Sequence, residues 1–159
     1  MGHLLVAAGA VVHGTGLDRR PTDCTVSHRM RLPEDIDPLM AQVRPEVVFH
    51  LAAPVNPGLV EDAHAARVAI VTGSRVLAAA CSRYDTRLIH IGTCAEYGSI
   101  STPYREEDVC QPAGAYSQLK YEATCAVSES SADWVVVRPF RTIGPGDNQS
   151  VVAAAIRAA

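Results

Sequence analysis

The chain has 159 residues, 48% of them apolar and 19% charged, so it is long enough for one domain with a core and too apolar to be disordered. Its net charge of −3 gives no electrostatic reason to expect nucleic acid or an anionic membrane as a partner. The apolar start at residues 1–13 lacks a basic region and is shorter than a membrane span of about 20 residues, so we expect no signal and no anchor.

Short apolar segments alternate with helical patterns along the chain. The segments are rich in β-branched residues, like parallel strands covered on both faces, and lie at 11–14, 47–51, 88–91 and 134–137, with a weaker candidate at 25–32. Helical patterns open at 33–37 and cover 62–82, 113–131 and 150–159. This alternation predicts a doubly wound parallel α/β sheet, in a single domain over residues 1–159 without a separate substrate domain.

Five cysteines are spread along the chain without a CxxC pair or a zinc-like grouping with the histidines. This use of cysteine fits a reducing compartment, and we expect a cytoplasmic protein without a metal. The stretch at 99–112 contains two prolines and no apolar periodicity, so it is predicted to be a surface loop.

Tyr116 and Lys120 lie four residues apart inside the predicted helix at 113–131. Residues at this spacing share a helix face, so a phenol and an ammonium can project into one pocket. A nearby ammonium lowers the tyrosine pKa from about 10 toward working pH, which suits proton transfer to or from a carbinol oxygen. A tyrosine and a lysine four residues apart also occur by chance, so the motifs around this pair decide whether it indicates a catalytic site.

Three predicted strands end in residues that suit a ligand site. Thr93 follows the strand at 88–91, and the carboxyl ends of such strands are where α/β sheets bind ligands. The strand at 47–51 ends in Ala52 and Ala53, which permit close approach of a flat ring. Pro139 follows the strand at 134–137.

In this order and spacing, the segments at 44–53, 89–98, 116–120 and 137–146 resemble the extended short-chain dehydrogenases/reductases, the family of NAD-dependent epimerases, dehydratases and 4-keto-reductases of nucleotide sugars. The likeness covers residues 11–158 and implies a Rossmann-like fold. It implies that Tyr116 is the acid/base, that Lys120 tunes it and orients the nicotinamide ribose, and that Thr93 bonds the reacting oxygen.

The resemblance also assigns ligand contacts to residues that match the family's motifs. Cofactor contacts fall on Asp18, Arg19, Leu51, Ala52, Ala53 and Pro139, and substrate contacts on Glu96, Arg138 and Arg141. Asp18 matches the acidic position that bonds the adenosine ribose of NAD, whereas Arg19 and Arg20 would equally serve the 2′-phosphate of NADP. Arg138 and Arg141 would bind a substrate diphosphate or, equally, cap the strand end.

The residues after Thr93 narrow the reaction that the resemblance implies. Dehydratases of the family usually place an acid and a carboxylate there, but this chain has Cys94 and Ala95, neither of which can run an elimination of water. The run from Ala95 to Gly98 looks more like the GDP-deoxyhexose reductases. A 4-keto-reductase or an epimerase is therefore favoured over a dehydratase.

The family's first strand and glycine-rich turn, whose N–H groups meet the cofactor pyrophosphate, have no match in this sequence. In one register residues 1–5 fall in the helix after that turn; in another, residues 4–8 form a substitute first strand. The central position of the sheet would be filled by residues 3–8, by direct pairing of its neighbours or by a second chain, which would make the protein a homo-oligomer. A fourth alternative is that the coding region begins further upstream.

Two hypotheses about function follow. The first is an NAD(P)-dependent reductase or epimerase that acts on a nucleotide-linked sugar, with Tyr116, Lys120 and Thr93 as its acid–base centre. The second is a family member that no longer binds a dinucleotide. It would serve as a binding or assembly module, or as an acid/base catalyst without redox chemistry.

Overall fold

The computed structural model describes residues 1–17, 21–53 and 63–143. Asp18, Arg19 and Arg20 lie outside these residues, as does the helix predicted at 150–159. In chain order the elements are α1 (Gly2–Ala7), β1 (His13–Gly16), β2 (Val26–Arg29), α2 (Ile36–Val43), β3 (Val47–His50), α3 (Ala63–Arg67), the π-helical turn η2 (Val68–Thr72), α4 (Gly73–Arg83), β4 (Arg87–Ile91), the 3₁₀ turn η3 (Cys94–Glu96), α5 (Ala115–Ser128) and β5 (Trp134–Val137).

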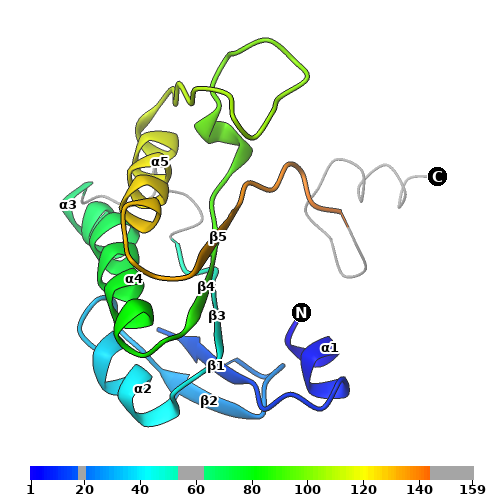
Figure 1. Ribbon diagram of the computed structural model, residues 1–159, viewed down its shortest axis with the longest axis vertical. Coiled ribbons are helices and arrows are strands. Elements are labelled where there is room, and N and C mark those ends of the chain that lie inside the picture. Colours follow the sequence, from blue (N-terminus) through cyan, green and yellow to red (C-terminus); the bar gives the residue numbers. More distant parts are fainter. Residues whose placement is uncertain (18–20, 54–62, 144–159) are drawn as a thin grey trace.

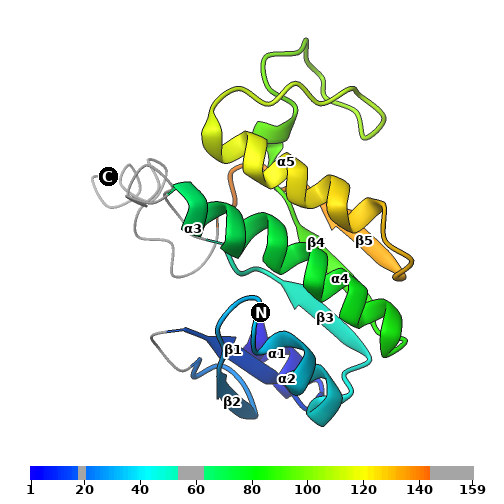
Figure 2. The ribbon, with the colours of Figure 1, turned by 90° about the vertical axis from the view of Figure 1, so that its left-hand side faces the viewer.

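All of the strand pairs are parallel, as predicted, but they form two sheets rather than one. One sheet has the order β1-β2 and the other the order β3-β4-β5. In the larger sheet Phe49 is level with Ile89, and Ile89 with Val135. Of the two strands in the smaller sheet, β1 is the one that lies nearer to β3 in both ribbon views (Figures 1 and 2). No hydrogen-bonded ladder joins β1 to β3 in the described part of the chain.

The N-terminal residues settle which of the two registers is correct. Residues 2–7 form the helix α1, so the prediction of a substitute strand at 4–8 is wrong and the helical register is confirmed. Direct pairing of the flanking strands is absent as well, because β1 and β3 belong to separate sheets. Strands β1 and β3 therefore each have one edge that pairs with no other strand within residues 1–17, 21–53 and 63–143.

Helices cover one face of the larger sheet. Helices α3, α4 and α5 lie together on one side of β3, β4 and β5 (Figures 1 and 2). The main apolar core joins α2, α4, β4 and α5, and its buried members are Ile36, Met40, Leu77, Ala78, Ala80, Cys81, Leu88 and Val127. Burying such side chains stabilises the fold by roughly 1.5–3 kcal/mol each for the larger ones.

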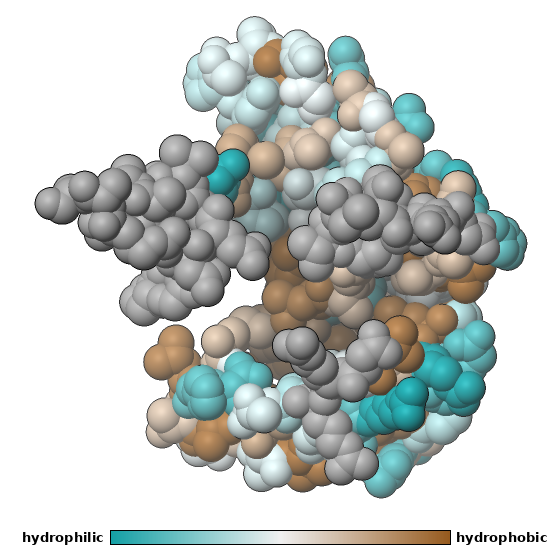
Figure 3. All heavy atoms as spheres, turned by 180° about the vertical axis from the view of Figure 1, so that it is seen from behind, coloured by the Kyte–Doolittle hydropathy of each residue, from teal (hydrophilic) through white to brown (hydrophobic). Residues whose placement is uncertain are grey.

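The other face of the larger sheet keeps apolar side chains exposed. Val47 and Phe49 alternate along β3, and both are exposed, as is Val137 at the end of β5. Figure 3 shows apolar side chains lining a hollow in the middle of its view. A parallel sheet is normally covered on both faces, so this bare face and the open edge of β3 are unusual features of the described residues.

Helices α3, η2 and α4 form one continuous helical stretch of 21 residues, Ala63–Arg83, which is long and apolar enough to cross a membrane by length and composition alone. Half of its most apolar window is buried inside the protein. It supplies Leu77 and Cys81 to the main apolar core, as a core helix of a globular domain does.

Candidate active site

The carboxyl end of β4 carries a tight turn built around Thr93. Gly92 ends the extended segment, and Thr93 caps the 3₁₀ turn η3. The Thr93 hydroxyl accepts a hydrogen bond from the Ala95 N–H at 3.3 Å, and the Thr93 N–H donates to Glu96 Oε1 at 2.9 Å. This reciprocal pattern is a capping box, so the backbone of Thr93 is held from both sides.

Helix α5 carries Tyr116 in its first turn. The Tyr116 side chain is half-buried and packs on a small apolar cluster of Ile70, Val71 and Ala123. Ala53, three residues beyond β3, packs on the same cluster. The structure thus brings Tyr116 into one neighbourhood with the predicted cofactor residue Ala53.

Lys120 lies one helical turn after Tyr116 and is 5% exposed. Its Nζ donates a hydrogen bond of 2.6 Å to the backbone oxygen of Ile91, the last residue of β4. Ile91 is two residues before Thr93 along the chain. The ammonium therefore lies at the same strand end as the Thr93 turn.

The electrostatics of this tyrosine differ from the prediction. Burial, and after it the negative charge of Glu96, raises the pKa of Tyr116, so the expected lowering by the lysine is wrong. Burial lowers the pKa of Lys120, and Glu96 opposes that change. Tyr116 is consequently a phenol, rather than a phenolate, at neutral pH.

Glu96 and Arg138, both predicted to contact substrate, lie against each other. Arg138 Nε donates to Glu96 Oε2 at 2.8 Å, and the Glu96 side chain is fully buried. The sequence signal for this placement was the T-x-x-E spacing from Thr93 to Glu96, which is typical of a capping box. Arg141, the third predicted substrate residue, is exposed.

The residues predicted to border the cofactor line up at two strand ends. Leu51 and Ala52 follow β3 directly and are exposed, whereas Ala53 is half-buried. The Pro139 backbone oxygen accepts a hydrogen bond of 3.2 Å from the Cys94 N–H, which joins the end of β5 to the turn after β4. The carboxyl ends of β4 and β5 therefore meet around Thr93.

The pyrophosphate half of a dinucleotide site has no match in the described residues. Such a cradle needs backbone N–H groups in a turn that leads from a strand into a helix. Residues 1–16 run in the opposite order, from helix α1 through a turn at Gly9 to strand β1. The described residues thus fit only the part of a dinucleotide that would lie near Tyr116, Lys120 and Ala53.

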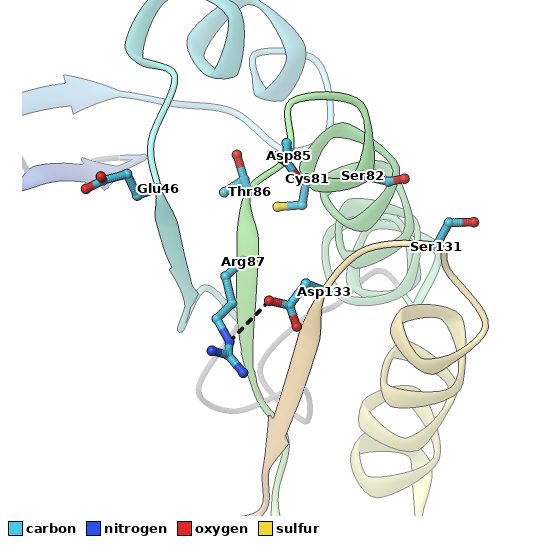
Figure 4. A pocket seen from close by; sticks show the side chains of 8 residues that line it. All are labelled: Glu46, Cys81, Ser82, Asp85, Thr86, Arg87, Ser131 and Asp133. Atoms are coloured by element: carbon cyan, nitrogen blue, oxygen red, sulfur yellow. Dashed lines mark ion pairs between the residues drawn. The ribbon is translucent and has the colours of Figure 1, made fainter.

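A pocket of about 230 Å³ lies at the opposite end of the sheet (Figure 4). Its lining includes Glu46 before β3, Arg87 at the start of β4 and Asp133 before β5; Arg87 Nε is 3.5 Å from Asp133 Oδ2. Parallel sheets bind ligands at the carboxyl ends of their strands, so this pocket is separate from the candidate site. Among the described residues, no three His, Cys, Asp or Glu side chains gather as a metal site would require.

Comparison with known families gives one match over nearly the whole chain. The model of the NAD dependent epimerase/dehydratase family matches residues 3–159. The sequence is 33% identical over 108 residues to a dTDP-4-dehydrorhamnose reductase of Burkholderia thailandensis, which covers 67% of this chain and 36% of that protein. It is also 33% identical over 96 residues to methionine adenosyltransferase 2 subunit beta of Bos taurus, covering 60% of this chain and 29% of that protein.

Solved structures show the same fold. WbmG of Bordetella bronchiseptica, in complex with NAD and UDP, superposes with a TM-score of 0.73 at 18% identity, covering 86% of this chain and 48% of that one. A dTDP-4-dehydrorhamnose reductase of Clostridium acetobutylicum gives a TM-score of 0.67 at 25% identity, covering 77% and 44%. The chain spans about a third of the length of the curated relatives above and less than half of these two structures.

Proposed function

This chain belongs to the NAD dependent epimerase/dehydratase family, and we propose that it acts on a nucleotide-linked sugar as a 4-keto-reductase or an epimerase. The observation that carries the proposal is the bond from Lys120 to Ile91, which puts an ammonium at the strand end that bears Thr93, one helical turn from Tyr116. The reductase relatives support the substrate class. Cys94 and Ala95, which cannot run an elimination, disfavour a dehydratase.

Proton transfer in this proposal belongs to Tyr116. A phenol whose pKa is raised stays protonated at neutral pH, so Tyr116 donates its proton to the oxygen of a sugar carbonyl as that carbonyl is reduced. The Thr93 hydroxyl accepts from Ala95, and its own proton, which has no acceptor among the described residues, bonds the same oxygen in this proposal. Lys120, held at the end of β4 by its bond to Ile91, orients the nicotinamide ribose in this proposal. A bound NADH or NADPH would supply the hydride.

Dinucleotide binding is the measurement that tests the reductase proposal. Because the described residues offer only the nicotinamide side of a site, we expect saturable but weak binding of NADH or NADPH, with a dissociation constant between about 1 µM and 1 mM in calorimetry. UDP-glucose and dTDP-4-dehydrorhamnose serve as probes of the sugar side. Absence of binding at millimolar dinucleotide, with the protein folded by circular dichroism, would overturn the redox proposal.

A second candidate function, a binding or assembly module, has its own support. The edges of β1 and β3 carry no partner strand in the described residues, and Val47 and Phe49 are exposed beside the edge of β3. Unpaired edges and apolar patches of this kind favour association. One relative is itself named as a subunit, methionine adenosyltransferase 2 subunit beta. We propose a second copy of this chain as the occupant.

Sedimentation velocity tests this second candidate. We expect a concentration-dependent dimer below about 100 µM, and we expect Phe49→Lys to shift it toward monomer by placing a charge on the apolar face. Val109→Lys is the matched control, because Val109 is 75% exposed in the loop at 99–112, away from the sheet. A monomer at every concentration, or equal loss of dimer in both variants, would contradict assembly through this face.

A further inference from the structure

The Glu96 carboxylate is the meeting point of three segments. Its Oε2 accepts from Arg138 Nε at 2.8 Å, and its Oε1 accepts from the Thr124 hydroxyl at 3.2 Å and from the Thr93 N–H at 2.9 Å. The donors come from the end of β5, from α5 and from the turn after β4. With no exposed surface, this side chain has no atom left for a substrate.

The neighbouring glycine shows that the backbone makes room for this carboxylate. A Cβ atom added to Gly92 would lie 2.5 Å from Glu96 Oε1, closer than any real contact allows. Gly92 lies between Ile91, whose oxygen binds Lys120, and Thr93, whose N–H binds Glu96. The end of β4 is therefore held by Lys120 on one side and by Glu96 on the other.

Arg138 is fixed by more than the carboxylate. Its guanidinium lies over the Tyr97 ring, 5.1 Å from the centroid, and Nη1 is 3.4 Å from the Tyr97 hydroxyl. The ion pair with Glu96 is largely shielded, since the Arg138 side chain is 19% exposed and that of Glu96 is 0% exposed. A shielded carboxylate acts on nearby titratable groups with little screening by solvent.

We propose that Glu96 and Arg138 form a positioning pair that fixes Thr93 at the end of β4 and keeps a buried negative charge beside Tyr116 and Lys120. The pair replaces the substrate contacts that the sequence assigned to both residues. Its bearing on turnover rests on the proposed function, but its effect on Tyr116 is measurable without turnover. Burial, and after it the charge of Glu96, raises the pKa of Tyr116 and so keeps its proton on the phenol, which is the form that a proton donor needs.

The test is the titration of Tyr116 in the full chain, followed by NMR with ¹³Cζ-labelled tyrosine and assigned by the signal that Tyr116→Phe removes. In Glu96→Gln, which keeps the shape but not the charge, we expect the Tyr116 midpoint to fall. Glu122→Gln is the control, because it removes the carboxylate of the exposed pair with Arg67 and leaves the site alone. Its Tyr116 midpoint should not change.

A second variant covers the case in which Glu96→Gln does not fold, since it leaves Arg138 shielded without its partner. The double variant Glu96→Gln/Arg138→Gln removes both charges, and replacing a whole buried pair is better tolerated than breaking it. We expect the same downward shift there. An unchanged Tyr116 midpoint in a folded variant would overturn the proposal, whether or not the protein reduces a sugar.

Where the protein does turn over, the pH profile is a further readout. A proton donor works only while protonated, so reductase activity falls as the pH rises through the Tyr116 pKa. In Glu96→Gln this alkaline limb should move to lower pH, with a loss of turnover from the released Thr93. If turnover falls but the alkaline limb stays at the same pH, the role of Glu96 is merely structural, and this result would count against the proposal.

Discussion

Replacing Tyr116 by phenylalanine is expected to lower kcat for reduction of a nucleotide-linked keto sugar by about 10²–10⁴-fold, the usual contribution of a general acid. The phenyl ring keeps the packing against Ile70, Val71 and Ala123, so the fold should be unaffected. KM should change little, because the variant removes a proton donor rather than a binding surface. Steady-state kinetics with NADPH and dTDP-4-dehydrorhamnose measures both constants.

Tyr121 supplies the matched control for this experiment. It lies on the same helix, five residues after Tyr116, and its hydroxyl interacts with Cys125. Tyr121→Phe should retain wild-type kcat. Undiminished turnover in Tyr116→Phe would remove the acid role from this residue, and equal losses in both variants would point to a general disturbance of α5.

Acid should destabilise this protein through two buried histidines, His50 on β3 and His90 on β4. Their ring centroids are 5.4 Å apart, and their exposed fractions are 6% and 0%. The Ser74 hydroxyl donates to the Ile70 oxygen at 2.7 Å, so it accepts from His50 Nε2 at 3.0 Å. Neither ring nitrogen of His90 has a hydrogen-bond partner in the described residues.

Burial, with Lys120 nearby, lowers the pKa of His50 to about 4; burial, His50 and Lys120 lower that of His90 to about 3. Unfolded histidines titrate near pH 6.5, so between that pH and the folded values the unfolded chain binds more protons. Stability is therefore full above about pH 6.5 and falls as the pH drops toward 4. Protonation of both rings removes roughly 3–5 kcal/mol of folding free energy per histidine once the pH lies below the folded pKa values.

Urea denaturation at several pH values between 7.5 and 4.5 measures this loss. His90→Phe should flatten the pH dependence and leave stability at pH 7 equal or higher, because it removes buried polar atoms that lack partners. His3→Gln, at an exposed position, should reproduce the wild-type curve. An acid slope that is the same in His90→Phe and in the wild type would contradict this account.

Most elements of the larger sheet were predictable because their signals are local. The run Trp134–Val137 became β5 over the predicted residues, and the segment at 47–51 became β3 with one residue fewer. Tyr116 and Lys120 share a helix face by spacing alone, so their common helix was predictable too. The first strand was predicted two residues early, because Val11 and Val12 look like a strand although the ladder with β2 starts at His13.

The electrostatics of the site were not predictable in the same way. Spacing indicated that Lys120 would lower the pKa of Tyr116, yet burial and Glu96 raise it. The pKa depends on the depth of the phenol and on a carboxylate twenty residues away in sequence, and neither quantity is local. The ion pair between Glu96 and Arg138 was not predictable for the same reason, because this contact joins residues 42 apart.

By itself, the sequence determined the alternation of strand and helix, the parallel pairing and the family, because apolar periodicity and short motifs depend only on residues that are close together in the chain. Only the tertiary structure decided that β1 and β3 stay in separate sheets, that residues 2–7 form a helix, and that Glu96 pairs with Arg138. These outcomes depend on which distant groups meet and how deeply they are buried. The free energy of a charged group or of an unpaired strand edge depends on how deeply that group is buried. Burial is a property of the folded chain and cannot be read from neighbouring residues.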